Sequence, residues 1–219
     1  MGCGPLIDEG IEHKNYGRGD SELTGNLGKG HKFSCNKNYK ISEEQAMLFR
    51  ATKKLIDTYK IIPAKNVAPE DSFYSWHCNV FYVNKWKCIL FMNDASRFSV
   101  AIFNVTQKIF NEALDDFFVQ LFENTLLAEK VEQNKIDEYF RRAQTAYFTT
   151  TANSSVIANM NQMVRYIDWI VEKFIKDGIL HSKELNIEIN HYLFSAISDY
   201  PYNAFIKKLN EMDIYTKTN

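Results

Sequence analysis

The sequence predicts an α+β fold, with a small antiparallel sheet around a central hairpin at about residues 76–93 packed against several helices. Two observations lead to this prediction. Two β-rich runs in this segment are separated only by Asn84-Lys85, and a connection of two residues is typical of a tight hairpin. From residue 106 onward, apolar residues recur at helical spacing in several segments. Strands are therefore expected early in the chain and helices late.

The composition is that of a globular protein with a substantial core. Of the 219 residues, 45% are hydrophobic, 24% are charged and 14% are aromatic, which excludes wholesale disorder. The 26 basic and 27 acidic residues leave a formal net charge of -1. This balance gives no reason to expect a nucleic-acid partner, because such binding draws mainly on positive charge.

The first 46 residues differ from the rest of the chain. They are polar and glycine-rich without a sustained apolar period, and we expect a flexible N-terminal extension over 1–46. No basic segment followed by an apolar run begins the chain, so we expect no secretory signal and a cytoplasmic location. No apolar stretch approaches the roughly 20 residues that span a membrane, and we expect no membrane association.

The folded body is expected to begin near Met47, as an α+β domain over 47–176 followed by a C-terminal helical segment over 177–219 that packs on it. A short strand at 48–51 precedes a helical turn at 53–59. In the hairpin, both faces are mostly apolar, which indicates a strand pair covered on both sides. The two-residue turn pairs Phe81 with Cys88, Asn79 with Leu90 and His77 with Met92, and places Cys78 and Cys88 on opposite faces, so we expect no disulfide between them.

The later elements follow from periodicity and capping residues. A third strand is expected at 98–105, and Thr106 is the expected N-cap of a long helix to about 127. Further elements are expected as a helix at about 134–144, a strand at 147–150, a helix from 154 to 176 with Gly178 as its C-terminal cap, and helices at about 182–198 and 201–212.

Four polar residues of the hairpin region can converge. His77 and Asn79 lie two residues apart on one strand, so their side chains leave the same face. Asp94 and Arg97 follow at the far end of the hairpin, where the chain returns beside His77. A histidine beside a carboxylate can act as a general base, and an arginine can hold an anion bidentately. We therefore take these four residues as candidate catalytic or binding residues.

The same four residues also fit a purely structural arrangement. In that alternative, Asp94 and Arg97 form an ion pair that closes the loop, and His77 satisfies a buried backbone carbonyl. The residues alone leave both interpretations open, and whether the protein is an enzyme is not decided.

The helix expected from 154 supplies a second candidate site for a ligand or partner. Ser154 and Ser155 stand at its start, where free backbone amides and the helix dipole attract anions, although serine there is first of all a cap. Asn159 and Asn161 add amide groups suited to contacts with a partner. No metal-ligand pattern and no cofactor motif is recognised, so we expect neither a metal nor a cofactor.

Several of these residues resemble an uncharacterised bacterial domain family. The resemblance rests on RATKKL at 50–55, on SWHCNVFYVNKWKCILFMNDASRF at 75–98, and on NSSV at 153–156 with Asn159 and Asn161. Its pattern is near W-H-A-N, R-K-C-L-L-F-x-N-D and R-[FY], and this chain has Cys78 and Trp86 where alanine and a basic residue are usual. Members of the family are sometimes fused to a domain similar to a plasmid ORF-3 protein. The match covers about 47–176 and implies a bacterial, intracellular α+β protein without a known activity.

Two functions are therefore considered. The first is a non-catalytic partner-binding or regulatory module, linked to mobile elements, that contacts a protein through the His77 region or the helix from 154. The alternative is a small hydrolase of an anionic or nucleotide-like substrate. In it, His77 is the base, Asp94 orients it, and Arg97 or the amides at Ser154 and Ser155 hold the anion.

Overall fold

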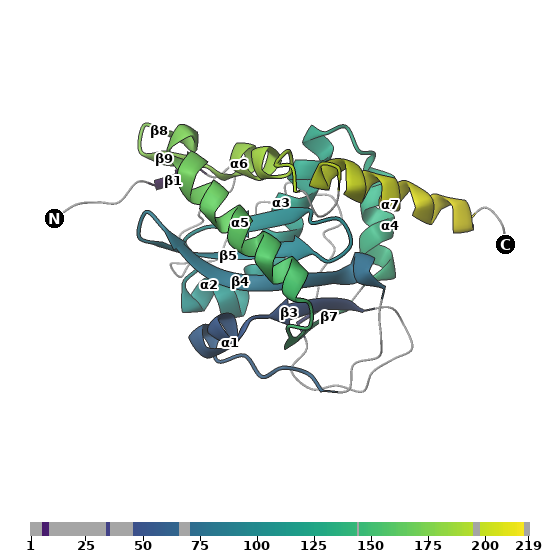
Figure 1. The fold of residues 1–219 in the computed structure, drawn as a ribbon, viewed down its shortest axis with the longest axis horizontal. Coiled ribbons are helices and arrows are strands. Elements are labelled where there is room, and N and C mark those ends of the chain that lie inside the picture. The colour runs from purple at the N-terminus through teal and green to yellow at the C-terminus, as the bar shows by residue number, and fades with distance from the viewer. Residues whose placement is uncertain are drawn as a thin grey trace, which may run out of the picture.

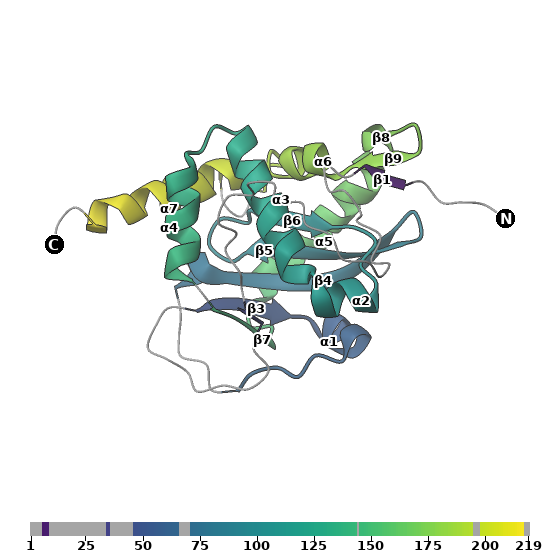
Figure 2. The same ribbon diagram turned by 180° about the vertical axis from the view of Figure 1, so that it is seen from behind.

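The computed structural model describes residues 6–8, 34–35, 46–65, 71–143, 145–194 and 198–216. Most of the expected N-terminal extension over 1–46 lies outside these residues; within it, the structure describes β1 (Leu6–Asp8), β2 (Ser34–Cys35) and Ala46. A six-stranded sheet of order β2-β7-β3-β4-β5-β6 forms the centre, and a three-stranded sheet of order β1-β9-β8 lies beside it. Helices cover both faces of the central sheet (Figures 1 and 2), so the α+β prediction is confirmed.

The central hairpin has the predicted register. β4 (Ser75–Val83) and β5 (Trp86–Asn93) are antiparallel, and His77 lies opposite Met92 as expected. Asn84 and Lys85 form the turn with φ values of 47° and 69°, which match the twist of a two-residue hairpin. β6 (Ser99–Ile102) adds a third antiparallel strand and is shorter than the expected 98–105.

The other half of the sheet is parallel, which the predicted antiparallel sheet did not include. β3 (Met47–Ala51) pairs in parallel with β4 on one side and with β7 (Thr145–Thr150) on the other. The chain between β3 and β4 contains α1 (Lys53–Tyr59) and the 3-10 turn η1 (Ser72–Tyr74). Parallel strands need such long connections, and β7 reaches β3 from far along the chain, so local patterns do not reveal the pairing.

One face of the sheet packs against an aromatic core. α3 (Leu114–Ala128), α4 (Gln133–Arg142) and α7 (Pro201–Thr216) contribute to it; α3 and α4 lie in front of the sheet in Figure 2. Trp76 is fully buried here, and its indole Nε1 donates to the Tyr139 hydroxyl at 3.0 Å. Tyr139 in turn donates to the Phe73 carbonyl at 3.0 Å, so the buried polar atoms of both rings are satisfied.

The opposite face is covered by α5 (Ser154–Ile170), which crosses in front of the sheet in Figure 1. α6 (Ser182–Ile189) packs into the same core from the edge of the sheet at β6. Met160 and Met163 of α5 are fully buried against Leu90 and Met92 of β5. Both methionines are core residues at helical spacing. Because the two sheet faces are both buried, the apolar pattern of the hairpin is explained, and Cys78 and Cys88 belong to opposite cores.

Four helix boundaries differ from the prediction. The helix expected from Thr106 to about 127 is divided into α2 (Gln107–Glu112) and α3, because Ala113 leaves helical geometry with φ -143°. Thr106 caps α2 as expected, accepting from the Ile109 amide at 3.2 Å. α6 ends at Ile189 rather than near 198, and α7 continues to Thr216.

The fourth difference concerns Gly178, which does not cap a helix. α5 ends at Ile170 and continues as the 3-10 turn η2 (Val171–Phe174) into the hairpin of β8 (Ile175–Lys176) and β9 (Ile179–His181). Asp177 and Gly178 have φ values of 51° and 77°, the two positive angles that this type of hairpin turn requires. Asp-Gly strongly favours a two-residue hairpin turn. The helix therefore ends earlier than the apolar residues at helical spacing up to Phe174 suggest.

Two asparagines, Asn186 of α6 and Asn190 at its C-terminal cap, close the free edge of β6. Asn186 accepts from the Ala101 amide at 2.7 Å and donates to the Ala101 carbonyl at 3.0 Å. Asn190, one helical turn later, pairs with the amide and carbonyl of Ser99 at 2.7 and 2.8 Å. The side-chain amides thus take the place of a seventh strand, which protects an edge that would otherwise be open to pairing. Within the described residues, no helix combines the length and apolar character that crossing a membrane requires.

Candidate functional site

His77 is the centre of the predicted polar group and is completely buried. Its Nδ1 atom lies 2.5 Å from Oδ1 of Asp94, and its Nε2 atom accepts from the backbone amide of Asn153 at 3.3 Å. A ring nitrogen that accepts an N–H carries no hydrogen of its own, so the geometry assigns the imidazole proton to Nδ1, which donates it to Asp94. Both nitrogens of the ring are therefore engaged within the fold.

Asp94 is held in position by the residue before it. Asn93 is fully buried, and its side-chain oxygen accepts from the amides of Ala95 and Ser96, each at 3.1 Å. Its side-chain nitrogen donates to the Phe73 carbonyl at 2.8 Å. These bonds build the turn between β5 and β6, and the turn presents the Asp94 carboxylate to His77.

The side chain of Arg50, on β3, forms an ion pair with Asp94. Arg50 is the register partner of His77 in the parallel pair of β3 and β4, so the two side chains leave the same face side by side. Arg50 Nε lies 3.2 Å from Asp94 Oδ2. The carboxylate is thus shared between His77 on one oxygen and Arg50 on the other.

Arg97 connects this turn to α5. It is 8% exposed and has a left-handed backbone, with φ 64°. Its Nη1 donates to the backbone carbonyl of Asp94, and its Nε donates to Oδ1 of Asn159 at 2.9 Å. Burial lowers the pKa of the Arg97 guanidinium, and the Asp94 carboxylate partly offsets this effect. The expected ion pair between the two side chains is replaced by a bond to the main chain.

The remaining predicted residues are placed differently. Asn79 leaves the same face as His77, but its Oδ1 accepts from the Thr52 hydroxyl at 2.8 Å, at the start of α1. Asn159 is buried against Arg97, whereas Asn161 is exposed on α5. Ser154 and Ser155 are exposed at the start of α5, where Asn153 is the N-cap. The structure therefore brings His77, Asp94, Arg97 and Asn159 into one network and leaves Asn79 and Asn161 outside it.

We call this set the polar network: Arg50, His77, Asp94, Arg97, Asn153 and Asn159. It joins β3, β4, the turn after β5 and the first turns of α5. A hydrogen-bonded network of this kind specifies how the helix sits on the sheet. It does not offer a ring nitrogen of His77 to a molecule outside the fold.

A family model, Domain of unknown function (DUF6933), matches residues 48–204. The chain belongs to this family. The DUF6933 match contains the whole polar network and continues beyond 176, where the expected resemblance ended, through α6 into α7. No curated protein matches the chain.

Two members of the polar network, Arg50 and Asn153, belong to the motifs of the resemblance but were not predicted as site residues. Arg50 is one charged residue within the otherwise apolar strand MLFRA, and that isolated charge was the available indication. Its importance depends on the parallel register with β4, which local patterns do not show. Asn153 preceding two serines is a recognisable cap, but its backbone bond to His77 is a long-range contact.

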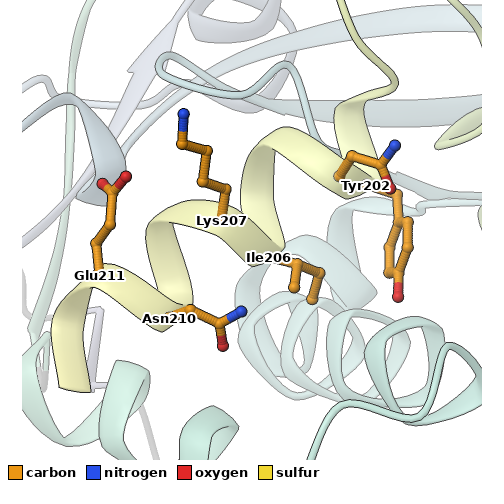
Figure 3. A pocket seen from close by; sticks show the side chains of 6 residues that line it. Tyr202, Ile206, Lys207, Asn210 and Glu211 are labelled. Atoms are coloured by element: carbon orange, nitrogen blue, oxygen red, sulfur yellow. The ribbon is translucent and has the colours of Figure 1, made fainter. Parts of the chain in front are cut away.

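A separate hollow lies along α7, far in sequence from the network. Its lining residues all belong to this one helix, namely Tyr202, Asn203, Ile206, Lys207, Asn210 and Glu211. Figure 3 shows Lys207 and Glu211 pointing the same way, with Asn210 and Ile206 directed elsewhere. Asn210 is engaged by Lys135 of α4 at 2.7 Å. Within the described residues, no group of three or more His, Cys, Asp or Glu side chains is arranged to hold a metal ion.

Proposed function

We propose that this chain is a non-catalytic protein-binding module and that its contact surface is the C-terminal half of α5. The observation that carries the proposal is the exposure of Trp169. It is 70% exposed, although tryptophan has the largest side chain of the hydrophobic residues. Exposure of the large indole ring to water is energetically unfavourable, and tryptophan is enriched among the interface residues that contribute most of the binding energy. Lys173 lies over its ring at 4.6 Å from the centroid.

Neighbouring rings hold this surface in place. Tyr166 lies 6.0 Å from Trp169 and 4.4 Å from Tyr192, measured between ring centroids. The Tyr166 hydroxyl donates to Glu188 of α6 at 2.9 Å. We call Tyr166, Trp169, Lys173 and Tyr192 the aromatic surface. Because Tyr166 is already held by Glu188 and Tyr192, little of its side-chain entropy remains to be lost when a partner binds.

The buried position of His77 is the reason for proposing binding rather than catalysis. A general base must reach the proton that it removes, directly or through one water. The hydrolase alternative gives this role to His77, whose ring is 0% exposed and whose Nε2 already accepts from Asn153. The regulatory role and the link to mobile elements, which the resemblance implies, belong to the same proposal of a protein partner.

The test is site-specific photo-crosslinking in the cells that produce the protein. A photoreactive phenylalanine replaces Trp169 in one variant and Tyr82 in another. Tyr82 is a matched control, because it is also an exposed aromatic residue, 55% exposed, with a lysine over its ring, but it lies on the central hairpin. We expect a discrete protein adduct from position 169 and none from position 82. Equal labelling at both positions, or none at 169, contradicts the proposed surface.

The binding energy is tested with the partner so identified. Trp169→Ser is expected to weaken its affinity by about tenfold or more, since large interface aromatics commonly contribute at least 1.4 kcal/mol. Tyr82→Ser is expected to leave the affinity unchanged. Similar affinities for Trp169→Ser and the unaltered protein would show that the adduct formed by proximity alone.

A further inference from the structure

We propose that Arg50, Thr149 and the N-terminal end of α5 form a binding site for a phosphate group. The three lie where the adjacent parallel strands β3 and β7 end. The helices that follow these strands leave toward opposite faces of the sheet, since α1 packs into the core with Trp76 and α5 packs into the core with Leu90. Ligands of sheets with helices on both faces commonly bind outside the carboxyl ends of strands at such a point.

Thr149 carries a buried hydroxyl that is free to hydrogen-bond an oxyanion. Thr149 is 9% exposed, and its Oγ1 atom has no hydrogen-bond partner within the part of the chain that the structure describes. Thr149 is the register partner of Arg50, which is itself the partner of His77. The three side chains therefore form a row on the face that α5 covers. A buried hydroxyl without a partner is destabilising, so such groups call for an explanation.

Arg50 supplies positive charge that its surroundings do not fully use. Its Nε lies 3.2 Å from Asp94 Oδ2 but is buried without an aligned hydrogen bond. Its side chain is 22% exposed, so part of Arg50 is accessible from outside the fold. The polar network contains two guanidinium groups, of Arg50 and Arg97, against the single carboxylate of Asp94, and the excess of positive charge favours an anion.

The start of α5 completes a set of donors, because α5 begins at Ser154, shortly after β7 ends at Thr150 (Figure 1). Asn153 Oδ1 accepts from the amides of Ser155 and Val156. The amide of Ser154 and the hydroxyls of Ser154 and Ser155 have no hydrogen bond within the described residues, and both serines are exposed. This 17-residue helix directs its positive dipole end at the same place. Hydroxyls, an amide and a guanidinium together match a tetrahedral oxyanion.

The experiment measures binding of inorganic phosphate to the full chain by isothermal titration calorimetry, with ionic strength held constant by chloride. We expect one saturable site. Thr149→Val keeps the shape of the side chain and removes the unpaired hydroxyl, so it should weaken phosphate binding about tenfold while leaving the melting temperature of the phosphate-free protein equal or higher. Thr150→Val is the matched control, since Thr150 is the next residue of β7, points to the other face and is exposed.

A second variant tests the charge. Arg50→Gln should abolish saturable binding, and Arg50→Lys should restore only part of it, because lysine keeps the charge without the planar fork. Adenosine monophosphate in place of inorganic phosphate tests whether the phosphate belongs to a larger ligand, which would bind more tightly. The proposal is overturned if the unaltered protein shows no saturable phosphate binding at millimolar concentrations, or if Thr149→Val binds phosphate as well as Thr150→Val does.

Discussion

The Nδ1 atom of His77 lies 2.5 Å from Oδ1 of Asp94, inside the protein and out of contact with solvent on the histidine side. Its other ring nitrogen, Nε2, accepts a hydrogen bond from the backbone amide of Asn153, the residue before α5. A pair of this kind resembles a catalytic dyad in composition, yet the second nitrogen of the ring is occupied by the protein itself. His77 and Asp94 therefore connect the central hairpin to α5.

Removal of His77 tests this structural role. His77→Ala should lower the free energy of unfolding by about 3 kcal/mol, because it leaves the Asp94 carboxylate and the Asn153 amide without their partner. The measurement is urea unfolding followed by circular dichroism. Asn79→Ala is the matched control, two residues along the same face, and should cost about 1 kcal/mol because Asn79 is only half-buried and makes one bond to Thr52. An unchanged free energy of unfolding in His77→Ala would instead favour a residue retained for catalysis.

The hairpin that carries His77 was predictable because its determinants are local. Asn84 and Lys85 adopt the two positive φ angles of a tight turn, and the alternation of apolar residues then determines which side chains face each core. The parallel strands were not predictable in the same way. Met47–Ala51 and Thr145–Thr150 are nearly a hundred residues apart, and their pairing depends on the packing of the helices between them.

Asn186 provides a test of the protected sheet edge. Asn186→Ala should lower the free energy of unfolding by about 2 kcal/mol, because the amide and carbonyl of Ala101 both lose their partner in a buried place. Lys183→Ala, at an exposed position of the same helix, should change it by less than about 0.5 kcal/mol. Equal effects of the two substitutions in urea unfolding would show that Asn186 does not hold the edge.

The thiol of Cys88 should be unreactive in the folded protein. Burial raises the pKa of Cys88 to about 12, and the thiolate is the reactive form. We expect iodoacetamide at pH 8 to leave the Cys88 peptide unmodified in native protein and to modify it in urea, as measured by mass spectrometry. The folded-state pKa lies above the ordinary value of 9, so the associated stability is complete below pH 9 and is lost as the pH rises toward 12. Rapid native alkylation at this cysteine would contradict the burial.

Glu138 predicts the opposite pH dependence. Hydrogen bonds from Arg141, and then from Arg142, lower the pKa of Glu138 to about 2. A lowered pKa stabilises the fold above the unfolded value near 4.5, and this contribution is lost as the pH falls toward 2. The pair of Glu138 and Arg141 is partly solvated, so Glu138→Gln should cost less than about 1 kcal/mol at pH 7. Urea unfolding at pH 7 and pH 3 should show this difference shrinking in acid, and a difference that grows in acid would exclude the assignment.

The sequence predicted that several residues of the candidate site come together, but not whether they face a ligand or the interior of the fold. His77, Asp94 and Arg97 come together because the hairpin register and the turn after it are local features. Whether a buried histidine faces a ligand or the fold depends on what approaches its second nitrogen, and here that group is the Asn153 amide, 76 residues along the chain. Arg50 and Thr149 were not predicted for a similar reason. They come next to His77 only through the parallel pairing of distant strands.

The tautomer of His77 tests the central claim most directly. Long-range ¹H–¹⁵N correlation spectra at pH 7, with the His77 resonances assigned by comparison with His77→Gln, separate a protonated ring nitrogen from an unprotonated one. The structure predicts that Nδ1 carries the proton, which is donated to Asp94, and that Nε2 is unprotonated because it accepts from Asn153. A proton on Nε2 at this pH would contradict the account, because that nitrogen would then no longer be held by α5.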